Sequence, residues 1–419
     1  MTLSIRDAAR SAGATPAVIT PTATITFAEL AARADAAELP TAGPGRASPL
    51  VATADLATVV TVCAALERHL PLALVTARTP AAERAALVAR VAAAEVAPTT
   101  AFVVFTSGST GRAKGVCLSR AAALGAAAAS AAHLGWRADD AWLAPLPLGH
   151  VGGLAVVVRC LVARRPIILD DAGALAGPTA TLASLVPAQL VALLDDPGWR
   201  PSPRLRAVLL GGAAAPPALV ARARARGVPV RPTYGMTETF GQVATADATT
   251  PQDAVGVPLP GVRITAGTAA APAPVRVHSP GLMDGYLDEP TPDLTAGFAT
   301  RDLGYLRDGQ LVVVGRVDDV IITGGENVYP QPLEASLVAI PGVAAAAVVG
   351  LADARWGQVI AAAIVVGPGY ARAALDAEVA RWPPHQRPRR WLELPALPRL
   401  ASGKVDYPAI AARFAAPSA

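Results

Sequence analysis

Short apolar runs rich in β-branched residues alternate with helical patterns through the middle of the chain. Residues 101–105 (AFVVF), 165–169 (RPIIL) and 205–210 (LRAVLL) are predicted to be buried parallel strands. The segments 187–196 and 216–227 have helical periodicity, and Gly227 is placed to close the second helix. A chain that alternates strands with helices covers both faces of its sheets with helices. The sequence therefore predicts an α/β protein built from layered sheets.

The pattern changes after residue 260, where prolines, glycines and short strands predict a small antiparallel or barrel-like section. The remaining predicted elements are a helix at 331–340, strands at 343–350 and 358–366, a helix at 371–381, and a strand and helix around Lys404. A chain of 419 residues is too long for one ordinary core. We predict a large N-terminal domain over residues 1–317 and a small α+β C-terminal domain over residues 318–419.

Composition argues against several classes of protein. The net charge of +4 is mild, the arginines are scattered, and there are only six each of Phe, Tyr and Trp, so nucleic-acid binding is not expected. Cys63, Cys117 and Cys160 have neither zinc-ligand spacing nor a disulfide pattern, which is typical of a reducing cytosol. The N-terminus shows no secretory pattern, and the alanine-rich stretch 121–136 is too short to span a bilayer. We expect a cytoplasmic protein without membrane insertion, in which 121–136 packs as a helix with Ser119 near its N-cap; a homo-oligomer is compatible with the sequence.

The strongest local signal is the segment 102–116 (FVVFTSGSTGRAKGV), in which a predicted strand runs into a loop of glycines and hydroxyl residues. The loop residues are Thr106, Ser107, Gly108, Ser109, Thr110 and Gly111, and Lys114 follows them. Backbone N–H groups turned outward by glycine, hydroxyl donors and a mobile ammonium together suit a polyphosphate. A Walker A motif would have Ser or Thr directly after the lysine, where this chain has Gly115, so a P-loop NTPase is disfavoured. The alternative, a surface turn, is disfavoured by the preceding strand and by the lysine.

Six segments, taken in order along the chain, resemble the motifs of the adenylate-forming superfamily of acyl-CoA synthetases, nonribosomal adenylation domains and luciferases. They are TSGSTGRAKG (106–115), GGAAAP (211–216), YGMTET (234–239), RDLGYL (301–306), GRVDDVIITGGENVYPQPLE (315–334) and PRLASGK (398–404). Six ordered motifs are more specific than any one of them, and the resemblance covers essentially the whole chain. It implies an enzyme that uses ATP and Mg²⁺ to activate a carboxylic acid as an acyl-AMP, and then transfers the acyl group to CoA.

The resemblance also implies which residues bind the nucleotide. The loop with Lys114 would bind the β- and γ-phosphates, Thr237 would donate to the α-phosphate, and Glu238 would hold the magnesium ion. The residues implied around the adenine and ribose are Gly211, Gly212, Ala213, Tyr234, Gly235, Asp302 and Arg316. A carboxylate such as that of Asp302 suits a vicinal diol because it accepts two hydrogen bonds at once. Taken singly, an acid or a tyrosine of this kind is more often structural, but six ordered motifs make that interpretation unfavourable for the set.

Two lysines are present, Lys114 and Lys404, and every other basic side chain besides histidine is arginine. A compact ammonium can approach both a substrate carboxylate and an α-phosphate oxygen, so the resemblance implies a catalytic role for Lys404 in adenylate formation. It also implies that the first subdomain, before residue 101, is shortened, and that Asp318 is a hinge about which a mobile C-terminal domain swings between two half-reactions. Gly324 and Gly325 would then leave room for the pantetheine arm of CoA. A solvated acidic turn at 318–319 is the alternative.

The stretch 144–161 bears on which acid is activated. Amino-acid-activating members of the superfamily typically carry an aspartate here, whereas this stretch has no carboxylate and contains His150 and Arg159. With 186–190, 234–245 and 324–330 it resembles the o-succinylbenzoate-CoA ligases of menaquinone synthesis, whose keto-dicarboxylic substrate would suit an extra cation. His150 is equally compatible with a core or helix-cap role, and Arg159 with a snorkelling helix residue.

Phe240 and Gly241 complete the candidates for the acyl pocket, and they depart from the Ala-Ser pair that is common in that subgroup. We predict a ligase that converts 2-succinylbenzoate to 2-succinylbenzoyl-CoA in menaquinone biosynthesis. The alternatives are another aryl- or acyl-CoA synthetase, or an acyl-AMP ligase that loads a carrier protein. A non-catalytic binding protein is hard to reconcile with the presence of Lys114, Glu238 and Lys404 together.

Overall fold

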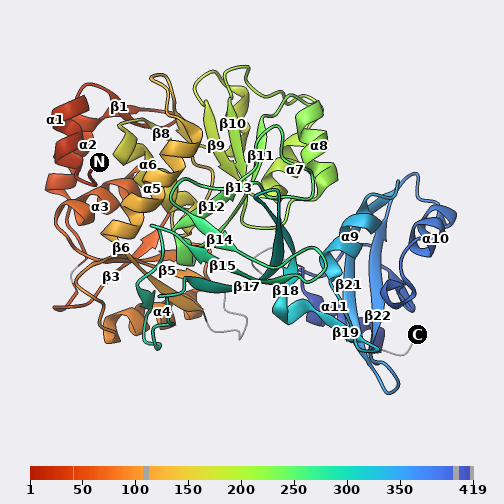
Figure 1. The fold of residues 1–419 in the computed structure, drawn as a ribbon. Coiled ribbons are helices and arrows are strands. Elements are labelled where there is room, and N and C mark those ends of the chain that lie inside the picture. Colours follow the sequence, from red (N-terminus) through yellow and green to blue (C-terminus); the bar gives the residue numbers. More distant parts are fainter. Residues whose placement is uncertain (41, 107–112, 400–404, 416–419) are drawn as a thin grey trace.

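The computed structural model describes residues 1–40, 42–106, 113–399 and 405–415. The predicted site residues Ser107, Gly108, Ser109, Thr110, Gly111 and Lys404 lie outside this part of the chain. Figure 1 shows three N-terminal sheets with their helices and, beside them, a smaller C-terminal unit in blue.

The largest layer is a nine-stranded sheet with the strand order β13-β12-β11-β10-β9-β7-β8-β1-β2. Its central pairs, from β11 to β1, are parallel, whereas β2, β12 and β13 are antiparallel additions at the two edges. The strands are β1 (Pro16–Ile19), β2 (Thr24–Thr26), β7 (Trp142–Leu143), β8 (Ile167–Ile168), β9 (Leu182–Leu185), β10 (Ala207–Leu210), β11 (Val230–Met236), β12 (Gly241–Thr245) and β13 (Val257–Pro258). All residues of β9 and β10 are buried, as expected of parallel strands covered on both faces.

A second sheet of five strands has the order β16-β6-β5-β4-β3. Its strands are β3 (Ser48–Ala52), β4 (Leu72–Thr76), β5 (Thr100–Thr106), β6 (Lys114–Ser119) and β16 (Gly285–Tyr286). The β5–β6 pair is antiparallel, with Thr106 opposite Lys114, so the predicted phosphate loop joins the two strands of a hairpin. The strand β16 comes from far along the chain and pairs with the outer edge of β6.

Helices separate and cover these two sheets (Figure 1). They are α1 (Ile5–Ala12), α2 (Phe27–Ala36), α3 (Leu56–Glu67), α4 (Ala81–Ala93), α5 (Arg120–Leu134), α6 (Val151–Ala163), α7 (Pro187–Asp195) and α8 (Pro217–Ala225), with short 3₁₀ turns η1 (Ala172–Ala176) and η2 (Thr237–Thr239). One core cluster contains residues of both sheets together with α5 and α6. The backbone of α5 passes so close to residue 280 that a Cβ on Gly125 would lie 2.5 Å from the Pro280 oxygen. The helix α5 therefore meets the segment between β15 and β16 at short range, through Gly125 and Ala126.

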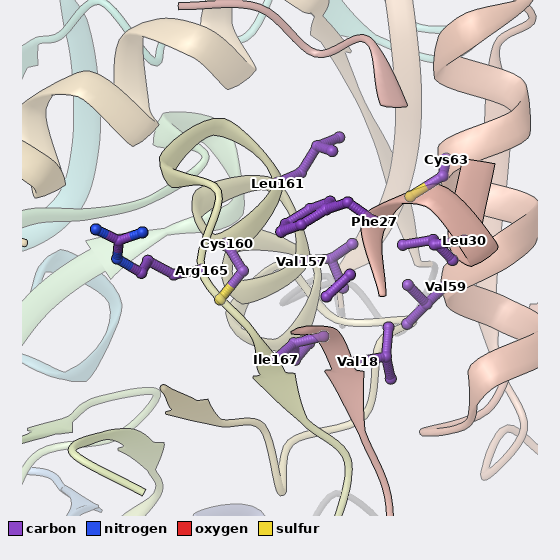
Figure 2. A pocket seen from close by; sticks show the side chains of 11 residues that line it. Val18, Phe27, Leu30, Val59, Cys63, Val157, Cys160, Leu161, Arg165 and Ile167 are labelled. Carbon is purple, nitrogen blue, oxygen red and sulfur yellow. The ribbon is translucent and has the colours of Figure 1, made fainter. Parts of the chain in front are cut away.

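A small apolar cavity lies inside this core, between α2, α3, α6 and the edge of the large sheet (Figure 2). Val18, Phe27, Leu30, Cys63 and Cys160 are among the side chains that line it. Its volume is about 10 Å³, which is close to the minimum for one water molecule. Burial raises the pKa of the Cys63 thiol to about 12, so this cysteine stays protonated. The cavity is a packing defect and not a substrate site.

The third sheet is antiparallel, in the order β14-β15-β17-β18. Its strands are β14 (Arg263–Thr265), β15 (Ala273–His278), β17 (Phe298–Arg307) and β18 (Gln310–Arg316). An isolated bridge between Gly256 and Leu311 joins this sheet to the segment that leads into β13. The antiparallel section predicted after residue 260 is therefore confirmed.

The C-terminal unit follows the 3₁₀ turn η3 (Val317–Asp319) and is built on a sheet of β20, β19, β22 and β21, with β23 also paired to β22. Its elements are β19 (Ile321–Thr323), β20 (Glu326–Val328), α9 (Pro330–Val338), β21 (Val343–Asp353), β22 (Gly357–Val366), α10 (Arg372–Ala380), η4 (Pro384–Gln386), β23 (Arg390–Glu393) and α11 (Tyr407–Ala415). Two core clusters lie within it, one with α9 and α10 and the other with α11. This unit thus has apolar cores made only of its own residues.

The elements predicted from periodicity are present where they were named, but the strand predicted at 101–105 is parallel only to β4 and is antiparallel to β6. The three predicted strands are β5, β8 and β10, and the two helices are α7 and α8. Gly227 follows α8 with φ of 80°, and the Ser119 side chain accepts a hydrogen bond from the backbone N–H of Ala122 at the start of α5. Within the described residues, no helix has the length and apolar character needed to cross a membrane.

Candidate active site

One cluster joins a tyrosine, an aspartate and an arginine from three strands. Tyr234 Oη donates to Asp302 Oδ2 at 2.6 Å, and Arg316 Nη1 donates to Asp302 Oδ1 at 3.0 Å. The antiparallel register of β17 and β18 sets Asp302 directly opposite Arg316. Burial, and then the neighbouring Asp302 carboxylate, raise the pKa of Tyr234, so the phenol remains a donor. Each carboxylate oxygen holds one donor and keeps a lone pair for an incoming hydroxyl.

The turn predicted to lie against the adenine follows β10, next to Tyr234. A Cβ on Gly211 would lie 2.9 Å from the Thr233 side chain, and Gly212 has φ of 78°. Residues 212–214 are exposed. The structure therefore brings the turn of Gly211, Gly212 and Ala213 to the strand that carries Tyr234.

A tight turn carries Thr237 and Glu238 from β11 to β12. A Cβ on Gly235 would lie 2.1 Å from the Gly241 oxygen, so the two ends of the turn meet and only glycine fits there. The hydroxyl of Thr239 closes the turn by donating to the Gly241 carbonyl at 2.6 Å. Glu238 is thereby held on a rigid 3₁₀ turn, which is a suitable base for a ligand.

Lys114 and Glu238 both contact the side chain of Tyr286. Lys114 Nζ lies 4.7 Å from the centroid of the Tyr286 ring and donates to Glu289 Oε2 at 2.9 Å. The Tyr286 hydroxyl donates to Glu238 Oε1 at 3.1 Å. The predicted phosphate lysine and the predicted metal ligand therefore contact the same side chain.

The donor set around Glu238 suits magnesium. In the described ranges no group of three or more His, Cys, Asp or Glu could enclose a metal ion. Magnesium in nucleotide sites is usually bound by one or two carboxylates together with phosphate oxygens and water. A single half-buried carboxylate beside a phosphate-binding lysine fits that mode, whereas it would not fit a structural metal site.

Arg159 is buried in α6 with no carboxylate beside it. Its residue exposure is 5 %, its Nε has no hydrogen-bond partner, and none of the ion pairs in the described part of the chain involves it. The guanidinium carbon lies 5.3 Å from the Trp142 ring centroid, and Nη2 lies 4.0 Å from the position of a Cβ on Gly241. Burial lowers the pKa of Arg159 to about 10. The snorkelling alternative is wrong, because a snorkelling arginine keeps its guanidinium in solvent, whereas the guanidinium of Arg159 is buried together with the aliphatic part of the side chain.

The other acyl-pocket candidates have different surroundings. Phe240 adopts a left-handed conformation, is 1 % exposed, and packs against Phe102 with ring centroids 6.1 Å apart. Its side chain therefore belongs to the core, while Gly241 leaves space beside Arg159. His150 occupies the N-cap position of α6 without a cap hydrogen bond from its side chain. With Thr106 it lines a cavity of about 130 Å³ at the end of β5.

The predicted hinge residue is paired in this structure. Both side-chain oxygens of Asp318 accept hydrogen bonds from Arg301 on β17, and this pair lowers the pKa of Asp318. The next residue, Asp319, has a pKa that burial raises, and it accepts a hydrogen bond from Gln331 of α9. The turn η3 is therefore linked to the third sheet on one side and to the C-terminal unit on the other.

Gly324 and Gly325 form the turn between β19 and β20, with φ of 60° and 85°. Both are exposed, and a Cβ on Gly324 would lie 2.9 Å from the Trp356 ring. The site residues thus form separate groups: one around Asp302, one around Tyr286, one around Arg159, and these glycines. No side-chain hydrogen bond or ion pair in the described residues joins one of the first three groups to another.

Sequence reasoning missed Tyr286 and Glu289, which touch two of the predicted residues. They lie in the segment GYLDEP (285–290), far from Lys114 and Glu238 along the chain. The only signal was a tyrosine followed by two acids within four residues, and nothing in that spacing indicates a partner. Their importance depends on the pairing of β16 with β6, which is a long-range contact.

Comparisons with known proteins place this geometry in a family. The model of the AMP-binding enzymes matches residues 41–287, more than half of the chain, and that of the AMP-binding enzyme C-terminal domain matches residues 332–404. A probable 2-succinylbenzoate–CoA ligase of Mycobacterium tuberculosis is 40% identical over 338 residues, which are 75% of this chain and 85% of that protein. A 2-succinylbenzoate–CoA ligase of Bacillus cereus is 36% identical over 337 residues, covering 72% of this chain and 68% of that protein.

Solved structures agree over nearly the whole length. The o-succinylbenzoate CoA synthetase of Bacillus subtilis, in complex with the acyl-adenylate intermediate OSB-AMP, has a TM-score of 0.86 and 26% identity, and the match covers 98% of both chains. The same enzyme in complex with ATP and magnesium ion has a TM-score of 0.83 and 25% identity, covering 96% of this chain and 98% of that one. The chain therefore belongs to the family of AMP-binding enzymes, and within it to the 2-succinylbenzoate–CoA ligases.

Proposed function

We propose that the chain is an AMP-forming acid–thiol ligase that converts 2-succinylbenzoate to 2-succinylbenzoyl-CoA, the thioester step of menaquinone biosynthesis. The observation that carries the choice of acid is Arg159, a buried guanidinium beside Gly241 that has no carboxylate partner among the described residues. A buried charge without a partner is unfavourable, and it is retained where a ligand supplies the opposite charge. A dicarboxylic acid does so, because one carboxylate reacts while the other stays ionised.

In the first half-reaction, a carboxylate oxygen of the acid attacks the α-phosphorus of ATP and the bond to pyrophosphate breaks. Lys114 and the loop residues Thr106 to Gly111 bind the β- and γ-phosphates, and Thr237 donates to the α-phosphate. Magnesium, when bound, neutralises charge on the phosphates, and Glu238 is the residue that would hold it. Lys404 binds the attacking carboxylate together with an α-phosphate oxygen.

The base and the sugar are held by the residues around Asp302. The lone pairs that Tyr234 and Arg316 leave on this carboxylate accept the two ribose hydroxyls. The ring of Tyr234 and the backbone from Gly211 to Ala213 then enclose the adenine. These contacts to the adenine and the ribose hold the α-phosphorus in position for attack, and in this way they contribute to the rate of adenylate formation.

In the second half-reaction, the CoA sulfur attacks the acyl carbonyl, the thiol proton is released and AMP leaves. We propose that residues 318–419 swing as a domain about Asp318 relative to residues 1–317, which brings Gly324 and Gly325 towards the pantetheine arm. Separate apolar cores in the C-terminal unit support such a movement. The pair between Arg301 and Asp318 has to open for it. ATP and CoA are cytoplasmic substrates, and we place the enzyme in that compartment.

The test is an incubation of the purified protein with ATP, Mg²⁺, CoA and 2-succinylbenzoate, followed by mass spectrometry for the thioester and a pyrophosphate assay. Benzoate and succinate, each carrying part of the substrate, serve as matched acids. We expect thioester from 2-succinylbenzoate and little from either fragment. Thioester formation with other aryl or fatty acids and none with 2-succinylbenzoate would refute the choice of acid. Pyrophosphate release without any thioester would point to a carrier-loading ligase.

A further inference from the structure

The segment 283–289 forms a strap that touches both the strand of Lys114 and the turn of Glu238. Its residues Gly285 and Tyr286 pair with Cys117 and Val116 of β6. The N–H of Leu287 donates to the Gly115 carbonyl at 2.7 Å, and that of Met283 donates to the Glu238 carbonyl at 2.8 Å. The backbone of the strap is therefore fixed to Glu238 itself and to Gly115, the residue next to Lys114.

Arg90 of α4 holds the end of the strap from outside. Its guanidinium donates to both carboxylate oxygens of Asp288 and, at 3.2 Å, to the Leu287 carbonyl. It also donates to the Ala113 carbonyl, one residue before Lys114. The side chain of Arg90 is 11 % exposed and that of Asp288 is 29 % exposed, so the arginine end of this clamp is largely buried. The strap and the start of β6 are thus bound to the same group.

Tyr286 faces both charged residues from this fixed position. Its hydroxyl donates to one oxygen of Glu238, which leaves the other oxygen to accept a metal ion. The face of its ring lies 4.7 Å from the Lys114 ammonium, within the range of a cation–π contact.

Glu289 supplies the negative charge that Lys114 faces before a nucleotide arrives. The two side chains are 2.9 Å apart and are 38 % and 24 % exposed, so their pairing is open to exchange. A polyphosphate carries more negative charge than one carboxylate and offers more acceptor oxygens. A polyphosphate that binds Lys114 therefore competes with Glu289 for the ammonium, and Glu289 also lies 3.9 Å from Arg90.

We propose that Tyr286 is a positioning residue that orients Glu238 and Lys114 for the magnesium-bound triphosphate, and that Glu289 is the counter-ion that Lys114 exchanges for the phosphates. The inference deepens the proposed function in that it concerns the same nucleotide site, but it does not depend on which acid is activated. It predicts opposite effects at two residues of one strap: removing the Glu289 charge favours nucleotide binding, and removing the Tyr286 hydroxyl weakens the response to magnesium.

The experiment measures binding of mant-labelled ATP by fluorescence, with Mg²⁺ varied and no acid present, in the full chain and its variants. Because a half-exposed ion pair contributes little, Glu289→Gln is expected to lower the Kd for Mg·ATP by about 2- to 5-fold. Tyr286→Phe keeps the ring and loses one hydrogen bond to a charged group, so the Mg²⁺ concentration for half-maximal binding should rise about 10-fold. Tyr286→Leu should also weaken binding in the absence of Mg²⁺, because it removes the ring face.

Two controls separate these effects from general changes. Glu95→Gln removes an exposed carboxylate beyond α4, and Tyr370→Phe removes a tyrosine hydroxyl in the C-terminal unit; neither should change binding. Unchanged or weaker binding in Glu289→Gln would overturn the exchange. A magnesium response of Tyr286→Phe equal to that of the unsubstituted protein would overturn the positioning role. A wrong acyl substrate would leave all of these results intact, since no acid is present.

Discussion

Replacing Arg159 with methionine should stabilise the protein and impair its selection of the acid. Burial lowers the pKa of Arg159 from 12.5 to about 10, which corresponds to about 3 kcal/mol against the charged form in the folded protein. Methionine fills a similar volume in an apolar pocket without a charge. We expect the free energy of unfolding of Arg159→Met to rise by about 1–3 kcal/mol, in line with other replacements of buried charges.

The same substitution removes the partner of the unreacted carboxylate. Charge-assisted hydrogen bonds contribute about 1.5–3 kcal/mol each, so kcat/KM for 2-succinylbenzoate should fall by about 10- to 100-fold. The loss should vanish for the analogue that retains only the reacting carboxylate. Arg159→Lys keeps a charge but not the planar fork, and should recover only part of the activity.

The assays are urea unfolding and ATP-dependent pyrophosphate release, with 2-succinylbenzoate and two analogues that each lack one carboxylate. Arg204→Met, which removes an arginine that is half exposed and paired with Asp139, is the control for charge removal, and should change neither stability nor selectivity appreciably. A less stable Arg159→Met protein with unchanged preference for the dicarboxylate would refute the reasoning. Such a result would mean that the guanidinium has a structural partner and does not bind substrate.

Three further predictions concern Lys404, Glu334 and the pair of Arg301 with Asp318. Lys404→Ala should abolish adenylate formation, measured as ATP–pyrophosphate exchange, while sparing thioester formation from synthetic acyl-AMP; equal loss of both steps would contradict its assignment. Burial raises the pKa of Glu334 to about 7 from 4.5, so about 3 kcal/mol of stability present below pH 4.5 should be lost as the pH rises through 7. The free energy of unfolding, measured with urea at pH 5 and at pH 8, should differ less in Glu334→Gln than in the unsubstituted protein. A smaller difference of the same sign should remain, because burial also raises the pKa of Asp319. An unchanged difference in Glu334→Gln would exclude this explanation. Arg301→Gln should speed thioester formation from acyl-AMP by about 2- to 5-fold in stopped flow, because an exposed pair with Asp318 is weak, whereas a slower step would show that the pair supports the swing.

Local sequence patterns predicted the elements whose start and end are encoded within the segment itself. The strand at 101–105 and the helix closed by Gly227 each carry their own start or stop signal, and the structure places both as expected. The order of the motifs identified the family before any contact was known. Neither the start and stop signals nor the order of the motifs depends on which strands pair with one another.

The parts that sequence reasoning missed depend on long-range packing. Sequence reasoning left Arg159 open between an acyl-pocket residue and a snorkelling helix residue, because Trp142 and the turn at Gly241, which enclose its head group, belong to two other elements. Phe240 follows a polar motif, and its left-handed backbone turns the ring into the core against Phe102. Tyr286 gained its neighbours only through the pairing of β16 with β6. In each case the decisive contact joins residues far apart along the chain.

The alanine-rich helix α5 affects how the layers hold together. Its buried face is made largely of alanine, and Gly125 brings its backbone against Pro280. Alanine has no side-chain rotamers to lose, so ordering this face carries almost no side-chain entropy cost. Alanine also buries little area per residue, so the packing of α5 against its neighbours depends on many dispersion contacts at short range. These contacts weaken steeply when a gap opens. A slight swelling at this seam would therefore weaken most of its contacts together, and we expect α5 to separate from residue 280 in one step.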